Sequence, residues 1–131
     1  MNNSLICIDT NIWIYFFAQK EPFAQELEQY LSNRRAVTTA INIAELFAGA
    51  KSEEEENFIQ KIVETIPVLD VTSVSASLAG TIQKKLLKEK RKNGFADCLI
   101  AACCLIHNVS LFTNNPKDFE HIETLQLIRM L

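Results

Sequence analysis

Four acidic residues stand beside apolar segments of this chain, far apart in sequence: Asp9, Glu45, Asp97 and Asp118. A carboxylate next to a buried element is costly unless a positive charge neutralises it. No single Lys or Arg is placed in the sequence to serve all four. If the fold brings the carboxylates together, their mutual repulsion calls for a divalent cation. Such a set is typical of a metal-dependent site that cleaves phosphodiester bonds.

Each of these acids also has an ordinary structural explanation. Asp9 follows a predicted strand, where Asp is common as a turn residue or a helix cap. Glu45 would lie on the polar face of an amphipathic helix, and Asp97 in a first helical turn, where the helix dipole favours a carboxylate. Asp118 would be an ordinary loop acid. Four acids at equivalent places in the topology nevertheless favour a shared site.

Short apolar segments alternate with helical patterns along the chain. Strands are expected at residues 4–8, 36–39, 67–71 and 109–113, and a last one at 126–128. Helices are expected at residues 12–18, 22–31, 40–48, 53–66, 73–93 and 96–107. This alternation predicts an α/β fold, a three-layer α/β/α sandwich around a mainly parallel sheet. In open sheets of this kind, ligands gather at the carboxyl ends of the strands, and the four acids fall near such ends.

Length and composition indicate a single globular domain, residues 1–131. The chain is 48% hydrophobic with three Gly and three Pro, so it can bury a core. Its apolar stretches are too short to cross a bilayer, and its N-terminus lacks the positive region of a secretory signal. The cysteines (Cys7, Cys98, Cys103 and Cys104) lack zinc-ligand spacing and are expected to be buried hydrophobes in a reducing compartment. We therefore expect a cytoplasmic protein that does not contact membranes.

Positive charge is concentrated in one short segment. The net charge is −3, yet six of the 13 basic residues fall between positions 84 and 92. Such a basic end on an acidic protein is suited to contact the phosphate backbone of RNA, or it is a solvated helix end that complements the helix dipole. The candidates for RNA contact are Lys84, Lys85, Lys88, Arg91 and Lys92.

Four sequence blocks, in order and well spaced, resemble the PIN domain family and specifically its VapC-type toxins. The first is the D-[ST]-[NS] start at residues 9–11, and the second is the Glu-bearing helix at 39–46. The third is a D-x-x-I-A-A block at 97–102, and the fourth a T-x-N-x-x-D-F block at 113–119. The first and third are weak signals alone, but the ordered set is specific and covers nearly the whole chain.

The resemblance implies a PIN-like fold and an endoribonuclease that uses Mg²⁺ or Mn²⁺ and leaves 5′-phosphate and 3′-hydroxyl ends. Its acidic residues carry over onto Asp9, Glu45, Asp97 and Asp118, with Asp9 and Asp97 as the principal metal ligands. Thr10, Thr113 and Asn115 carry over as supporting polar groups. Either Asn115 or Asp118 would approach the metal more closely. The resemblance further implies a homodimer and a small cognate antitoxin.

Other functions remain open at the level of sequence. A PIN-like ribonuclease of RNA processing would need no antitoxin. A small α/β regulatory module could use an acidic pocket for Mg²⁺, although the chain lacks the Asp and Lys arrangement of a receiver domain. A PIN scaffold without activity is disfavoured because all four acids are present.

Overall fold

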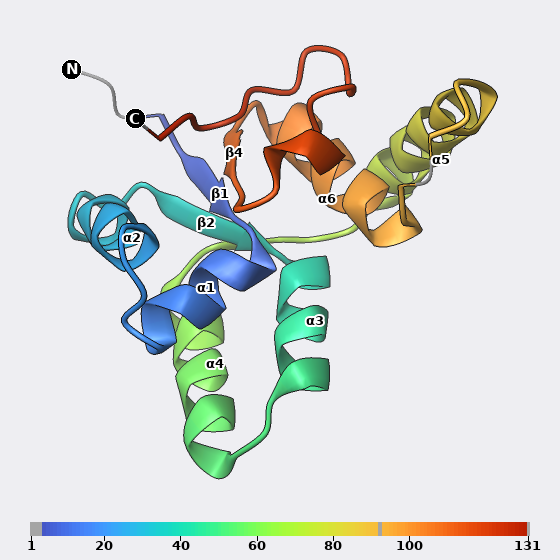
Figure 1. Cartoon of the computed structure of the whole chain (residues 1–131). Coiled ribbons are helices and arrows are strands. Elements are labelled where there is room, and N and C mark those ends of the chain that lie inside the picture. Colours follow the sequence, from blue (N-terminus) through green and yellow to red (C-terminus); the bar gives the residue numbers. More distant parts are fainter. Residues whose placement is uncertain (1–3, 92, 131) are drawn as a thin grey trace.

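The computed structural model of this protein describes residues 4–91 and 93–130. Strands alternate with helices in this part of the chain, as the sequence predicts (Figure 1). The first half comprises β1 (Ile6–Ile8), α1 (Thr10–Phe17), α2 (Phe23–Ser32), β2 (Ala36–Thr39), α3 (Ala40–Gly49) and α4 (Glu53–Thr65). The second half comprises β3 (Val68–Leu69), α5 (Ser73–Lys88), α6 (Phe95–His107), β4 (Ser110–Phe112) and a 3-10 turn (Pro116–Asp118).

The strands form one parallel sheet in the order β3-β2-β1-β4. β1 lies between β2 and β4, and its Cys7 pairs with Val37 on one side and with Leu111 on the other. Ile8, the last residue of β1, pairs with Phe112, the last residue of β4. The segments that follow these two strands therefore leave the sheet side by side.

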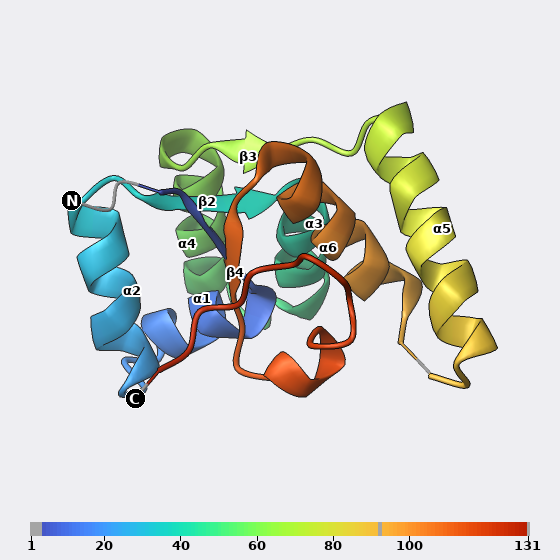
Figure 2. The same ribbon diagram turned by 90° about the horizontal axis from the view of Figure 1, so that it is seen from above.

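Side chains of the sheet alternate between two hydrophobic cores, as the pleat of a strand requires. Ile6, Ile8 and Phe112 point into the core shared with α1, α2, α3 and α4. Cys7 and Leu111 point into the core shared with α5 and α6. In both views α5 lies outside α6, at the edge of the molecule (Figures 1 and 2). The predicted three-layer α/β/α arrangement around a parallel sheet is confirmed.

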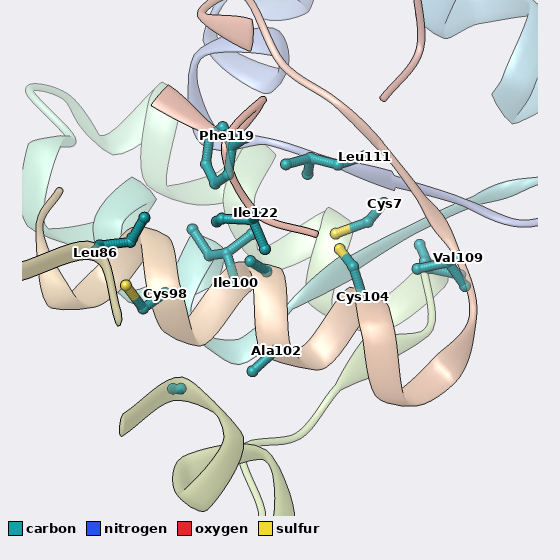
Figure 3. Packing of buried hydrophobic residues seen from close by; sticks show 13 residues of the cluster. Cys7, Leu86, Cys98, Ile100, Ala102, Cys104, Val109, Leu111, Phe119 and Ile122 are labelled. Atoms are coloured by element: carbon teal, nitrogen blue, oxygen red, sulfur yellow. The ribbon is translucent and has the colours of Figure 1, made fainter. Parts of the chain in front are cut away.

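The core beside α6 holds three of the cysteines, Cys7, Cys98 and Cys104, as small hydrophobes. All four are buried free thiols, in agreement with the expectation from their apolar surroundings. The sulfurs of Cys7 and Cys104 point toward each other (Figure 3). A hydrogen bond between these side chains, together with burial, raises the pKa of the Cys7 thiol well above its usual value, so it stays protonated. Among the described residues, no helix is long and apolar enough to span a bilayer.

Several predicted boundaries are wrong. α1 begins at Thr10 and not at residue 12, because Asp9 caps it through a 2.9 Å bond from the Thr10 amide. α5 ends at Lys88 and not near residue 93, since Lys90 takes a left-handed backbone (φ 61°) that no helix can continue. The expected strand at 126–128 is reduced to a single parallel bridge between Leu127 and Leu111.

Candidate active site

Asp9 lies where β1 turns into α1. Its backbone amide donates to the Phe112 carbonyl (3.0 Å), which extends the β1–β4 pairing by one residue. Its Oδ1 accepts the Thr10 amide as the helix cap. The Asp9 carboxylate is thus fixed at the carboxyl ends of two adjacent strands.

The segment after β4 reaches back to Asp9 and forward to Asp118. The Thr113 hydroxyl donates to Asp9 Oδ2 (2.7 Å). The Asn115 amide donates to Thr113 Oγ1 (3.1 Å), and Asn115 Nδ2 donates to Asp118 Oδ2 (2.6 Å). Thr113 and Asn115 therefore each hold a different carboxylate, and the Asn115 side chain supports Asp118 directly.

Glu45 lies on α3, which begins at the carboxyl end of β2. Thr39 caps α3, and Glu45 follows in the second turn. The Thr10 hydroxyl donates to Glu45 Oε1 (2.6 Å). Thr10 therefore ties Glu45 to the segment that carries Asp9.

Asp97 lies in the first turn of α6, half-buried beside the other three acids. Burial first, and then the negative charges of Asp118, Asp9 and Glu45, raise the pKa of Asp97 to about 6. Within the described residues, Asp97 accepts no hydrogen bond from a side chain, unlike the other three acids. The fold therefore gathers all four carboxylates at one rim of the sheet, as the topology predicted.

Comparison with known proteins assigns the chain to a family. The PIN domain family matches residues 6–125, a range that contains all four acids. The chain belongs to the PIN domain family. Ribonuclease VapC1 of Haemophilus influenzae (strain R2866) is 33% identical over 124 residues, which cover 91% of this chain and 92% of that protein. The tRNA(fMet)-specific endonuclease VapC of Shigella flexneri is 28% identical, with 91% of this chain and 92% of that protein covered.

Solved structures share the PIN fold over almost the whole chain. VapBC-1 from nontypeable Haemophilus influenzae superposes with a TM-score of 0.75 at 30% identity, covering 95% of this chain and 96% of that chain. VapBC2 from Rickettsia felis, bound to a DNA fragment from its promoter, gives a TM-score of 0.81 at 23% identity and covers 97% and 99%. These likenesses agree with the parallel sheet and helical layers of this PIN domain.

Asn42 belongs to the PIN-domain rim but was missed by reading the sequence. It is completely buried, and its Nδ2 donates to Asp9 Oδ1 and to Thr10 Oγ1, both at 3.0 Å. Its Oδ1 accepts from the Thr39 amide (3.2 Å) and the Thr39 hydroxyl (2.7 Å). A capping box spaced Thr39-x-x-Asn42 was the available signal, because it fixes the Asn side chain at the helix start.

Positive charge does not neutralise the four acids directly. In residues 4–91 and 93–130 the ion pairs are Lys85 with Glu123 and Arg91 with Glu89, and neither involves the rim. In the same residues, no three acidic, His or Cys side chains are clustered tightly enough to hold a metal ion as they stand. Carboxylates that repel one another are expected to stay apart in this way. Their hard oxygen atoms are nevertheless the donors that Mg²⁺ and Mn²⁺ prefer.

The basic candidates for RNA contact divide into three groups. Lys84 and Lys88 are exposed on the last turns of α5. Lys85 is engaged in its ion pair with Glu123. Arg91 follows the helix, with its Nε 3.7 Å from Glu89 Oε1. Lys92 lies outside the described residues.

Proposed function

We propose that this chain is a metal-dependent endoribonuclease and the toxin of a VapBC-type toxin–antitoxin pair. The observation that carries the proposal is the gathering of Asp9, Glu45, Asp97 and Asp118 at one rim of a PIN domain. The similarity to proteins named ribonuclease VapC supports RNA as the substrate. A one-domain protein, residues 1–131, would be sufficient to carry this site.

The donor chemistry of the rim fits Mg²⁺ or Mn²⁺. Asp9 and Asp97 are the proposed principal ligands, and Glu45 and Asp118 would ligate directly or through water, after small side-chain rotations. When bound, such an ion lowers the pKa of a coordinated water and stabilises charge on the leaving oxygen. The raised pKa of Asp97 reflects how unfavourable its ionised form is among its neighbours, and a cation would relieve this.

The side chains around the acids have orienting roles in this mechanism. Thr113 and Asn42 hold the two Asp9 oxygens from opposite sides. Thr10 holds Glu45 Oε1, and Asn115 holds Asp118 Oδ2. Glu45 or Asp118 would accept the proton from the attacking water on its remaining carboxylate oxygen. Because these bonds fix the orientation of the acids, the attacking water would stay within hydrogen-bond reach of the carboxylate that accepts its proton and close to the phosphate that is cut.

The proposed function predicts metal-dependent cleavage of RNA. Purified protein is expected to cut single-stranded RNA in Mn²⁺ or Mg²⁺, and to stop when EDTA is added, because the carboxylates alone cannot lower the pKa of the water or stabilise charge on the leaving oxygen. Activity should return when Mn²⁺ is restored in excess. Gel analysis of end-labelled RNA measures both effects. Cleavage that persists in EDTA at the same rate would exclude the metal-dependent mechanism.

Asn42→Ala is expected to weaken Mn²⁺ binding and kcat by roughly 10- to 100-fold, because the Asp9 carboxylate loses the amide that orients it. The Mn²⁺-induced rise in melting temperature measures binding without reference to activity. Asn42→Asp keeps an acceptor for Thr39 but places a second carboxylate 3.0 Å from Asp9 Oδ1, and it should show the same defect. Asn11→Ala is the matched control, since within residues 4–91 and 93–130 its exposed side-chain amide hydrogen-bonds only to Asn114. Wild-type Mn²⁺ binding by Asn42→Ala would contradict this positioning role.

Partners follow from the same proposal. A toxin–antitoxin complex from Klebsiella pneumoniae contains a chain that is 25% identical to this one, which supports a cognate antitoxin here. A small open reading frame just upstream of the gene would favour the toxin over an RNA-processing PIN ribonuclease, and its absence would favour the latter. We also propose a homodimer, which the mass of the purified protein in solution tests. RNA as substrate and reduced thiols are consistent with action in the cytoplasm.

A further inference from the structure

The surface beside Asp97 and Asp118 is hollowed. This hollow has a volume of about 330 Å³, and the two acids form part of its lining. Three cations also line it, Lys90, Arg91 and Lys117, together with Asn93 and His121. Three positive charges thus face two negative ones, in a protein whose net charge is −3. The hollow adjoins the carboxylate rim, because Asp97 and Asp118 belong to both.

The charges of these cations are largely available to a ligand. Within the described residues, Lys90 and Lys117 form no ion pair, and Arg91 has only the 3.7 Å contact with Glu89. The shielded Nε of Arg91 has no hydrogen-bond partner in that same part of the chain, while its side chain as a whole is 40% exposed. The exposed N–H groups of the guanidinium can form charge-assisted hydrogen bonds with an anion.

The two walls of the hollow are braced against each other. Asn93 Nδ2 donates to the Asp118 carbonyl, which joins the segment before α6 to the 3-10 turn. Gln83 Nε2 donates to the Asn93 carbonyl (3.3 Å) and so joins α5 to the same segment. The ion pair between Lys85 and Glu123 adds a further tie between α5 and the chain after the turn. The segments that carry the cations are therefore held together before a ligand binds, which reduces the entropy lost on binding.

We propose that this hollow binds a backbone phosphate of the RNA strand, next to the phosphate that is cut at the carboxylates. The inference rests on the proposed ribonuclease function and assigns Arg91, Lys90 and Lys117 as its phosphate contacts. The rim repels phosphates along most of its length, so a strand needs cations at its side to remain there. Of the basic residues near position 90, Lys84 stands on the exposed side of α5 and does not line the hollow in the described structure.

Binding of a labelled, short single-stranded RNA in EDTA tests this assignment without cleavage. Lys117→Gln and Arg91→Gln are each expected to weaken binding on the order of tenfold at about 50 mM salt, since each removes one phosphate contact. The slope of log Kd against log salt should fall by about 0.7 for each lost contact on a single strand. The matched control is Lys61→Gln, at an exposed position of α4 across the sheet. This variant is expected to bind like the wild type, with an unchanged slope.

The results of these measurements decide whether the hollow binds a backbone phosphate. Wild-type affinity and slope in both Lys117→Gln and Arg91→Gln would overturn the phosphate site, as would an equal loss of binding in Lys61→Gln. Arg91→Gln alone could lose binding by misfolding, so its melting temperature is measured and Lys117→Gln, at an exposed position, carries the result. Cleavage by the wild type in Mn²⁺ is measured in parallel. If the wild type cleaves RNA while the variants bind it normally, the phosphate site is wrong and the ribonuclease function is supported. If the wild type neither binds nor cleaves RNA, both proposals are wrong.

Discussion

Asp97→Asn is expected to lower the rate of RNA cleavage on the order of 10³-fold while making the metal-free protein more stable at neutral pH. The loss of activity follows from removal of a proposed metal ligand. The gain in stability follows from the raised pKa, about 6 against an ordinary 3.8, which burial and then Asp118, Asp9 and Glu45 cause. A folded state that binds the Asp97 proton more tightly than the unfolded chain loses stability as pH rises from about 4 to about 6. Above about pH 6 the folded protein carries the full free-energy cost of ionising Asp97.

Thermal unfolding in EDTA at about pH 4 and about pH 7.5 measures this effect. The melting temperature of Asp97→Asn should exceed that of the wild type at the higher pH and nearly equal it at the lower. Asp70→Asn is the matched control, because Asp70 is exposed and is not among the charges that raise the pKa of Asp97. It should change neither cleavage nor the pH dependence of stability. Full cleavage by a folded Asp97→Asn protein would remove Asp97 from the active site.

The arrangement of layers could be predicted from the sequence because the strands and helices differ in length and periodicity. Residues 6–8 and 110–112 are apolar at every position but Ser110, as expected for strands with helices on both faces. The ends of the helices and strands were harder to predict from the sequence. α5 stops at Lys88 through a left-handed Lys90, a residue type that gives no local warning of such a backbone. The pairing at Leu127 depends on how the chain returns to β4, a long-range contact that local pattern cannot fix.

The position of the four acids was predictable for a related reason. Parallel strands end at one edge, so acids that follow strands or begin the next helices converge there. Their hydrogen bonds were not predictable. That Thr113 holds Asp9 while Asn115 holds Asp118 depends on register and rotamers. Asn42 was overlooked because a buried amide in the first turn of a helix has no chemical signature of its own. The catalytic roles themselves stay predictions that the variants test.

Phe112→Ala is expected to lower the free energy of unfolding by about 3–5 kcal/mol, and the melting temperature by roughly 10–15 °C. Phe112 is fully buried at the end of β4. Its ring lies 5.7 Å from that of Tyr30, edge to face, and 6.4 Å from that of Phe23. Truncation would leave a cavity between the sheet and α2 that these rings cannot fill by small movements. Denaturant unfolding measures the loss.

Phe112→Ala also tests whether core packing positions Asp9. The Phe112 carbonyl accepts the Asp9 amide, and Thr113, which follows directly, holds Asp9 Oδ2. Relaxation of β4 into the cavity would therefore shift Asp9, and the Mn²⁺-induced rise in melting temperature should shrink along with overall stability. Phe95→Ala is the matched control, since its ring is 56% exposed at the start of α6, and it should change stability by less than about 1 kcal/mol. If Phe112→Ala is strongly destabilised yet binds Mn²⁺ like the wild type, the β4 core supports the fold without positioning Asp9.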